Sequence, residues 1–551
     1  MDTTLYLGLD CSTQGMTAAV LDGAARRMVH AVALNYERDF PQYGVRAGVL
    51  PSPDPALAHA PPRMWAEALD AVLGRLRADG LDLSAVRALA VSGQQHGSVY
   101  LNAAAEATLA ALRPDRPLAA QIEGIFARPT APIWMDSSTR AECDEIRAAL
   151  GGTLAAAALT GSDVFERFAG PQIRRFWRLD PAGYERTAQI ALVSSFLTSL
   201  LVGRVAPMEP GDAAGMNLMD IHTLVWSPDA LAATAPDLRR RLPPIVPSDS
   251  IVAPVAPWLI GRHGFSPLAR VIPGTGDNPS SLVGIGLTGP GVLAISLGTS
   301  DTGFAAQSEC RTDPRGEGHV FGAPMGGTMA LICLRNGSLA RERVRDAYGL
   351  DWQGFNAALR ATLPGNGGRL LLPWFEPEIV PRVAAPGVAR RGLAEDDAAG
   401  HCRGVAEAQA MALRLHTQWI GPRPSAIRAT GGASANPEIC RILAEVFGCP
   451  VDRFESANSA ALGAALRAAH ADLAARGEPM QWADLVAPLT APASRTLPDS
   501  AAVAVYERLL PVYAEFEAEE IARRSIAGTA QGSAVTSAPA GPARVAKPGA
   551  G

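Results

Sequence analysis

The sequence predicts an α/β protein whose two halves are built alike. Its 551 residues are too many for one ordinary hydrophobic core, so two large domains or three smaller ones are expected. Short apolar runs typical of buried strands alternate with segments of helical periodicity. Two strands, near residues 5 and 293, each lead into a turn of glycine and small hydroxyl residues and then a second strand. This favours a duplicated architecture; a chance resemblance between two hairpins is the alternative.

The composition points to a small-molecule partner and a cytoplasmic protein. The formal net charge is −5, with 54 acidic against 49 basic residues, which argues against nucleic acid or an anionic membrane as partner. The seven cysteines are scattered without a C-x-x-C pair, as expected of reduced thiols. No basic segment precedes the first apolar run, so no secretory signal is expected. The apolar segment Ile190 to Val202 is too short to span a membrane and predicts a buried helix.

Lysine usage excludes several mechanisms. Lys547 is the only lysine, and it lies near the C-terminus. A Walker A loop, the strand lysine of protein kinases and a Schiff-base enzyme each need a lysine within the folded body. If this chain handles ATP, it does so with other groups.

The N-terminal hairpin is the first candidate phosphate site. A strand over Leu5 to Asp10 and another over Met16 to Leu21 flank the turn CSTQG. Ser12 and Thr13 in that turn leave backbone N–H groups for phosphate oxygens, and Asp10 can hold a hydrated magnesium ion. A plain hairpin turn is the alternative.

Polar side chains follow the next strands. An irregular segment over residues 39–62 and a helix from about Met64 to Ala78 precede a strand, Arg87 to Val91, that ends in SGQQHG. His96 there suits hydroxyl recognition, because imidazole can donate and accept; a satisfied strand-end histidine is equally expected.

Three further segments carry candidates for ligand contact. The run Ile133 to Met135 predicts a strand exit, followed by a helix capped by Ser137 or Ser138. Trp134 could form an apolar wall and Asp136 could bind a hydroxyl; ordinary core and capping roles for both are the alternative. Arg167 is placed to reach an oxygen-rich ligand, although a structural ion pair is the commoner use. The loop over residues 205–215 carries Glu209 and Asp212, with a solvated turn as the alternative.

The stretch GTGDNPSS, residues 274–281, is the candidate chemical centre. Asn278 as N-cap and Pro279 at the first helical position predict a helix, with Asp277 just ahead of it. A carboxylate there could take a proton from a hydroxyl while the helix start faces a phosphoryl group; capping alone is the alternative. The nearby GIGLTG matches a dinucleotide fingerprint but lies between a preceding helix and a following strand, the reverse of the required order.

The second half repeats the first hairpin and adds a glycine pair. Gly298 and Thr299 lie in the turn of LAISLGTSDTGF. In ATGGASANPEI, Gly431 and Gly432 would let a flat ring approach the backbone, and Asn436 could bind adenine or ribose or serve only as a helix cap. A last helix, Val503 to Ser525, is expected to be bent or interrupted by Pro511, and a disordered tail is expected from Ile526.

This ordered series of motifs resembles the FGGY carbohydrate kinases, and among them the longer type of D-xylulose kinase. The resemblance runs through LGLDCSTQG, SGQQHGS, WMDSS, TGSDVFERFAG, LVSSF, GDNPSSL, SLGTSDT, NGSL, ATGGAS and ANSAALGAA. It implies two actin-like (ribonuclease-H-like) domains with mixed β-sheets and flanking helices, closing over a cleft that holds ATP and sugar. The expected ranges are 1–289 for the sugar-binding and catalytic domain, 290–525 for the ATP-binding domain and 526–551 for the tail.

The resemblance also implies roles for the candidates. Asp277 would be the catalytic base acting on D-xylulose, in a monomer or homodimer that uses ATP and Mg²⁺. Other assignments by matching motif are Asp10 for the metal; Ser12, Thr13, Gly298 and Thr299 for phosphate; Gly431, Gly432 and Asn436 for the nucleotide; and His96, Arg167 and Asn278 for the sugar. Two roles are open for Trp134, Asp136 and Glu209: contact with the ligand, or only shaping of its pocket. The alternatives are another substrate, namely D-ribulose, L-xylulose, a longer ketose or glycerol, or a non-catalytic sensor.

Overall fold

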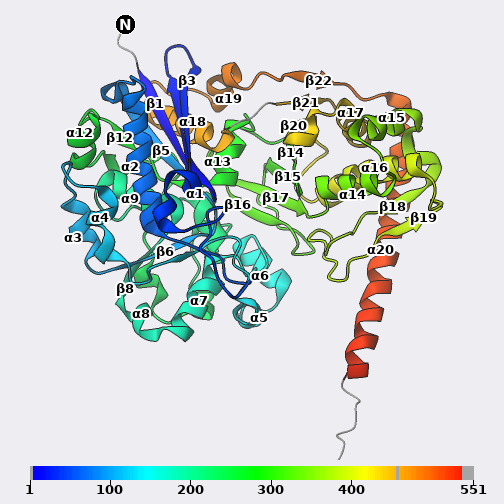
Figure 1. Ribbon diagram of the computed structural model, residues 1–551, viewed down its shortest axis with the longest axis horizontal. Coiled ribbons are helices and arrows are strands. Elements are labelled where there is room, and N and C mark those ends of the chain that lie inside the picture. Colours follow the sequence, from blue (N-terminus) through cyan, green and yellow to red (C-terminus); the bar gives the residue numbers. More distant parts are fainter. Residues whose placement is uncertain (1–3, 455–457, 536–551) are drawn as a thin grey trace, which may run out of the picture.

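Two mixed β-sheets side by side form the frame of the molecule (Figure 1). The computed structural model describes residues 4–454 and 458–535, with side chains to residue 524. Each sheet has seven strands. The first is drawn mainly in blue on the left of Figure 1 and the second in green and yellow on the right.

The first sheet is built around the N-terminal strand. Strand β1 (Leu5–Cys11) pairs antiparallel with β2 (Gly15–Asp22), and β2 pairs antiparallel with β3 (Arg27–Asn35). On its other side β1 runs parallel to β5 (Val86–Gly93). Beyond β5 lie β12 (Arg270–Val271), parallel to it, and β11 (Ala253–Pro254), antiparallel to β12, while β13 (Thr275–Gly276) also pairs with β5. The hairpin is as predicted; β3 was not expected.

The second sheet repeats this order. Strand β14 (Val292–Leu297) pairs antiparallel with β15 (Asp301–Ala306), which pairs with β17 (Thr328–Leu334), and the edge strand β16 (His319–Gly322) follows. On its other side lie the parallel β20 (Ala426–Thr430) and β21 (Val451–Arg453), then the antiparallel β22 (Ser494–Thr496). Hairpin and parallel strands thus occupy the same positions in both sheets, which confirms the predicted duplication.

Helices and small two-stranded sheets surround these frames. In the first half the helices are α1 (Tyr36–Asp39), α2 (Pro62–Ala78), α3 (Ala105–Ala110), α4 (Leu118–Gln121), α5 (Arg140–Ala149), α6 (Thr153–Thr160), α7 (Ala169–Leu179), α8 (Pro181–Arg186), α9 (Val193–Val202), α10 (Pro210–Ala213), α11 (Pro228–Thr234), α12 (Pro257–His263) and α13 (Asp277–Gly284). In the second half they are α14 (Ser338–Ala347), α15 (Trp352–Ala361), α16 (Ala398–His416), α17 (Pro437–Phe447), α18 (Ser459–Ala475), α19 (Trp482–Val486) and α20 (Ser500–Val535). The small sheets pair β4 (His59–Ala60) with β7 (Ala131–Pro132), β6 (Ser98–Asn102) with β8 (Thr187–Leu192), β9 (Met219–Asp220) with β10 (Val225–Trp226), and β18 (Leu370–Leu372) with β19 (Ala389–Arg391).

Helix α18 crosses from the second half to the first. It belongs by sequence to the predicted ATP-binding range, yet it packs on β1, β5 and α13 of the first sheet (Figure 1). The backbones of these elements touch each other directly. A Cβ added to Gly8 of β1 would lie 1.9 Å from the carbonyl oxygen of Ala461, and a Cβ added to Gly463 would lie 1.8 Å from the carbonyl oxygen of Ser280. Glycine therefore sets how near α18 approaches the first sheet and α13. The division at residue 289 stays a prediction.

Three local predictions were wrong. Strand β7 ends at Pro132, so Ile133 to Met135 lie in the turn after it and not in the strand. The following helix begins at Arg140 after Thr139, not at Ser137 or Ser138, because the Ser138 N–H is held by the carboxylate of Asp136 and the Ser137 N–H by the Ala56 carbonyl. Helix α20 continues to Val535, ten residues into the predicted disordered tail, in a stretch that contains alanine but no proline. The rest of that tail, residues 536–551, lies outside the described residues.

Two further observations concern the cysteines and the apolar segments. All seven cysteines are free thiols. Among the described residues no helix is both long enough and apolar enough to cross a membrane. Ile190 to Val202 ends as the predicted buried helix, α9, preceded by the last residues of β8.

The contact between α18 and α13 generates a prediction about stability. We expect Gly463→Ala to lower the melting temperature, because the new methyl group has no space beside the Ser280 carbonyl; overpacking of this kind costs about 1–3 kcal/mol. Gly74→Ala in α2 is the matched control: no atom lies within 4 Å of the added Cβ, so the helix should be unchanged or stabilised. Thermal unfolding of both variants measures the difference, and equal melting temperatures would contradict the packing argument.

Candidate functional site

Strand register brings the two candidate carboxylates to the same edge of the first sheet. Asp10 on β1 lies opposite Ser92 on β5, and Thr275 on β13 lies opposite Ser92 from the other side. All three strands are parallel, so their carboxyl ends meet at one edge. Asp277 follows Thr275 by two residues and is the first residue of α13.

Asp277 is held at the helix start by its neighbour. Gly276, in extended backbone, takes the cap position, so Asn278 is not the N-cap that the sequence predicted. Because β13 leads directly into the helix, the Asn278 amide is left free to donate to Asp277 Oδ1 (3.0 Å) and to Gln95 Oε1 (2.8 Å). One carboxylate oxygen of Asp277 is thereby oriented by a side chain.

The pKa of Asp277 suits proton transfer. Burial raises it to about 7, and the negative charge of Asp10 adds to the rise, while hydrogen bonds from backbone N–H groups oppose it. Burial also raises the pKa of Asp10 to about 6. Carboxyl groups perturbed in this direction are typical of sites of chemistry.

Buried polar atoms without hydrogen-bond partners occur at Asp10 and at the end of the neighbouring strand β5. Asp10 Oδ1, Ser92 Oγ and Gln94 Nε2 make no hydrogen bond within the part of the chain that the structure describes. Such orphaned groups are costly unless a ligand or water satisfies them. No cluster of three metal-ligating side chains occurs in the described ranges. A single carboxylate fits Mg²⁺, which keeps most of its waters and is shared with phosphate oxygens.

Many polar groups of the first hairpin turn are hydrogen-bonded within the turn or to neighbouring side chains. Ser12 donates through both its backbone N–H and its hydroxyl to the Gly15 carbonyl, each at 3.0 Å. Thr13 Oγ1 donates to Gln94 Oε1 (3.4 Å) and accepts from Trp134 Nε1 (2.8 Å). Both donors of Ser12, including the backbone N–H that was predicted to bind phosphate, therefore close the turn itself, and Trp134, 45% exposed, braces it.

The second turn and the glycine pair lie at the matching edge of the second sheet. Gly298 follows β14 and Gly431 follows the parallel β20, whose Thr430 pairs with Ser296. The Gly298 carbonyl accepts from the N–H of Ser338 at the start of α14 (2.8 Å), and Thr299 is exposed.

Backbone geometry explains the glycine at position 431. Its φ of +83° favours glycine, and an added Cβ would lie 2.5 Å from the Leu297 carbonyl oxygen. Both Gly431 and Gly432 are exposed. Asn436 is the predicted N-cap of α17: it accepts from Glu438 N (3.0 Å) and donates to Asn356 Oδ1 (2.6 Å). Nucleotide contact by these residues stays a prediction.

Of the three candidate sugar residues, His96 lies near Arg167, and Asn278 bonds to Gln95, the neighbour of His96. His96 donates through Nδ1 to the Gly215 carbonyl (2.8 Å) and stacks on Phe168 at 4.3 Å. Burial, with the nearby charge of Arg167, lowers the pKa of His96 to about 3, so the ring is neutral and Nε2 is an acceptor. Gln95, the preceding residue, receives the bond from Asn278.

Two of the three ambiguous residues support the scaffold. Asp136 accepts from Ala58 N (3.0 Å), from the Ser138 N–H and hydroxyl, and from Gln172 Nε2 (2.7 Å). Glu209 accepts from Asp212 N (2.8 Å), Ser248 Oγ (2.6 Å) and Thr275 Oγ1, and so braces the strand that leads to Asp277. Sequence reasoning missed His319, which bonds to Arg167 at 2.7 Å, because no local pattern marks it.

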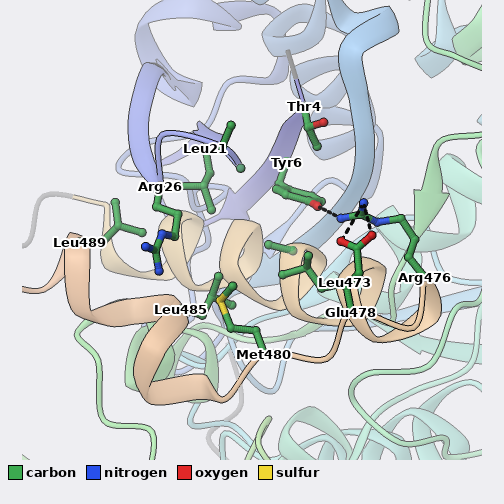
Figure 2. A pocket seen from close by; sticks show the side chains of 13 residues that line it. Thr4, Tyr6, Leu21, Arg26, Leu473, Arg476, Glu478, Met480, Leu485 and Leu489 are labelled. Atoms are coloured by element: carbon green, nitrogen blue, oxygen red, sulfur yellow. Dashed lines mark hydrogen bonds and ion pairs between the residues drawn. The ribbon is translucent and has the colours of Figure 1, made fainter. Parts of the chain in front are cut away.

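A separate cavity of about 220 Å³ lies at the other end of the first sheet. Figure 2 shows its lining, from Thr4 and Tyr6 at the start of β1 to Leu473 and Arg476 at the end of α18. Asp10, near the other end of β1, does not line it. Tyr6 donates to the carboxylate of Asp472, and Arg476 donates to the Tyr6 hydroxyl, so the polar groups there are engaged in structural bonds.

Comparison with known proteins covers both halves. The model of the FGGY family of carbohydrate kinases, N-terminal domain, matches residues 129–284, and that of the C-terminal domain matches residues 293–471. Xylulose kinase of Rattus norvegicus is 39% identical over 522 residues, covering 93% of this chain and 96% of that protein. Xylulose kinase 2 of Arabidopsis thaliana is 40% identical over 489 residues, covering 85% and 87%.

Solved structures agree in fold. A kinase from Brucella ovis, described as a xyloylose kinase, matches with a TM-score of 0.76 at 25% identity, over 93% of this chain and 98% of that one. Xylulose kinase from Rhodospirillum rubrum matches with a TM-score of 0.77 at 22% identity, over 94% and 98%. These matches confirm the predicted pair of actin-like α/β domains.

The raised pKa of Asp277 predicts a pH-dependent stability. An aspartate in the unfolded chain has a pKa near 3.9, whereas Asp277 in the folded protein keeps its proton up to about pH 7. Protonation of Asp277 therefore stabilises the fold at low pH, and this contribution is lost as the pH rises through about 7. We expect Asp277→Asn to melt at a higher temperature than the parent protein at pH 8, by a margin that shrinks toward pH 5. Exposed Asp229→Asn in α11 is the control. A margin that does not change between these pH values would contradict the assignment.

Proposed function

This chain belongs to the FGGY family of carbohydrate kinases, and we propose that it transfers the γ-phosphoryl group of ATP to a hydroxyl of D-xylulose, with Asp277 as general base. The observation that carries the proposal is a carboxyl group of pKa about 7 at a helix start, beside a second carboxylate and unpartnered buried polar atoms. The product would be D-xylulose 5-phosphate. Relatives named as xylulose kinases support the substrate.

In the proposed reaction, Asp277 orients the attacking hydroxyl and accepts its proton late. The hydroxyl oxygen forms a bond to the γ-phosphorus while the bond from that phosphorus to the β,γ-bridging oxygen breaks, and ADP leaves with the bonding electrons. In such a loose transition state the nucleophile needs positioning more than early deprotonation. Asn278 holds Oδ1 of Asp277, which leaves Oδ2 to face the hydroxyl. A pKa near the working pH favours the transfer.

Metal and phosphate contacts belong to the same proposal. Bound Mg²⁺ would neutralise phosphate charge, and Asp10 is the side chain that would hold it. The backbone near Thr13 and the turn with Gly298 and Thr299 would receive the phosphates, and the exposed pair Gly431 and Gly432 the nucleotide. The positive end of α13 would favour the charge of the transferred group.

The sugar contacts fit a neutral, hydroxyl-rich ligand. His96 presents a neutral acceptor, Arg167 a fixed set of donors, and Asn278 an amide, so both partners of a hydroxyl are available. D-ribulose, L-xylulose, a longer ketose or glycerol are the alternative substrates, since sites of this kind separate them by hydroxyl geometry. We also propose a cytoplasmic location, which free thiols support, and a monomer or homodimer.

The substrate is tested by a coupled ADP-release assay over a panel of D-xylulose, D-ribulose, L-xylulose and glycerol with Mg²⁺ and ATP. We expect the highest kcat/KM for D-xylulose. A higher value for another member would replace the substrate, and ADP release that is the same with and without every sugar would overturn the kinase proposal.

The base is tested by Asp277→Asn. General-base assistance is typically worth roughly 10²–10⁴-fold, so turnover should fall on that scale or more while sugar and ATP still bind. Calorimetric binding of both ligands separates this result from misfolding, and Asp229→Asn, on the exposed face of α11, should keep full turnover. Near-normal turnover of the Asp277→Asn variant would contradict the assignment of Asp277 as the general base.

A further inference from the structure

One candidate sugar residue reaches across the boundary between the two halves. Arg167 lies in the first half, between α6 and α7, and its Nη2 donates to Nε2 of His319 (2.7 Å) on β16, the edge strand of the second sheet. Figure 1 shows β16 where the two halves meet. The strand is also fixed there by its backbone, since Val320 N donates to the Gly161 carbonyl (2.8 Å).

Hydrogen bonds define the state of His319. Its Nδ1 lies 3.1 Å from Ser162 Oγ, and its Nε2 faces an arginine, which can only donate. The arrangement assigns a neutral ring with the proton on Nδ1 and an acceptor at Nε2. The ring is 2% exposed, and burial with the charge of Arg167 holds its pKa well below the usual range. A protonated ring would lose this bond and repel Arg167.

Aromatic rings also surround the guanidinium of Arg167. The Arg167 guanidinium lies over Phe165 at 5.1 Å and over Phe168 at 5.7 Å, and Phe168 carries the stacked His96 on its ring. Within the described ranges Arg167 forms no ion pair with a carboxylate. A neutral acceptor and ring faces fix the guanidinium without cancelling its charge, whereas a carboxylate partner would cancel it.

We infer that His319 is a positioning residue for Arg167, so that the second sheet contributes to the sugar site. The inference rests on the proposed function, in which Arg167 contacts the sugar. His319 takes one of the guanidinium's donors and leaves the others directed at the ligand. Sugar affinity therefore depends on β16 being docked against the first half, while ATP contacts, at the turns after β14 and β20, do not use His319.

A matched pair of substitutions separates the two bonds of the ring. His319→Gln places its amide near the position of Nε2 and can still accept from Arg167. His319→Asn places its amide near Nδ1, so it can bond Ser162 but does not reach Arg167. A bond to a charged group is worth roughly 10- to 100-fold in an equilibrium, so we expect KM for D-xylulose to rise by that factor in His319→Asn and to stay near the parent value in His319→Gln. KM for ATP should change in neither.

An Arg167→Ala background supplies the second readout. There, His319→Asn should add no further rise in KM for D-xylulose, because its effect passes through the arginine. An equal rise in KM in both His319 variants, or an additive effect in the Arg167→Ala background, would overturn the inference. If His319→Asn does not fold, Ser162→Ala, which removes only the acceptor of Nδ1–H, should raise KM for the sugar in the same direction, and an unchanged KM would count against the inference. Absence of ketose-dependent ADP release in the parent protein would instead contradict the proposed function.

Discussion

The parallel register of β1, β5 and β13 is the constraint on which the rest of the site depends. It delivers Asp10 and Asp277 to one edge of the first sheet, where burial and the charge of Asp10 raise the pKa of Asp277 to about 7. Two buried carboxylates that are both ionised repel each other. A cation beside Asp10 would relieve that repulsion and lower the pKa of Asp277, so ligand binding and proton affinity are linked at this edge.

The scaffold behind this edge explains how two buried carboxyl groups are held close together. Glu209 bonds Thr275 at the end of β13, and α18 packs at backbone distance on α13 through Gly463. Both contacts fix the strand and the helix that carry Asp277. Catalytic positioning of this kind needs rigid elements, because a displaced base loses the in-line geometry that the reaction requires.

Local sequence patterns predicted what depends on local chemistry. The strand–turn–strand pattern gave both hairpins, and of the residues that the motif series singled out the fold brings His96 near Arg167, and Asn278 to Gln95, the neighbour of His96. The helix start was misjudged because Asn278, a good cap by propensity, is recruited by Gln95, 183 positions away in sequence. Likewise no periodicity reveals that α18 packs on the first sheet or that His319 meets Arg167, since both contacts depend on how the two halves dock.

The contact between Arg167 and His319 gives the duplicated fold a consequence that neither sheet has alone. If the arginine is oriented for sugar only while β16 is docked, sugar binding stabilises the docked arrangement of the two halves by the same free energy that docking adds to sugar binding. The second sheet also carries the turns proposed for ATP. Sugar occupancy would thus favour the alignment of donor and acceptor, and without sugar the phosphoryl group would have a less ordered site from which to reach water.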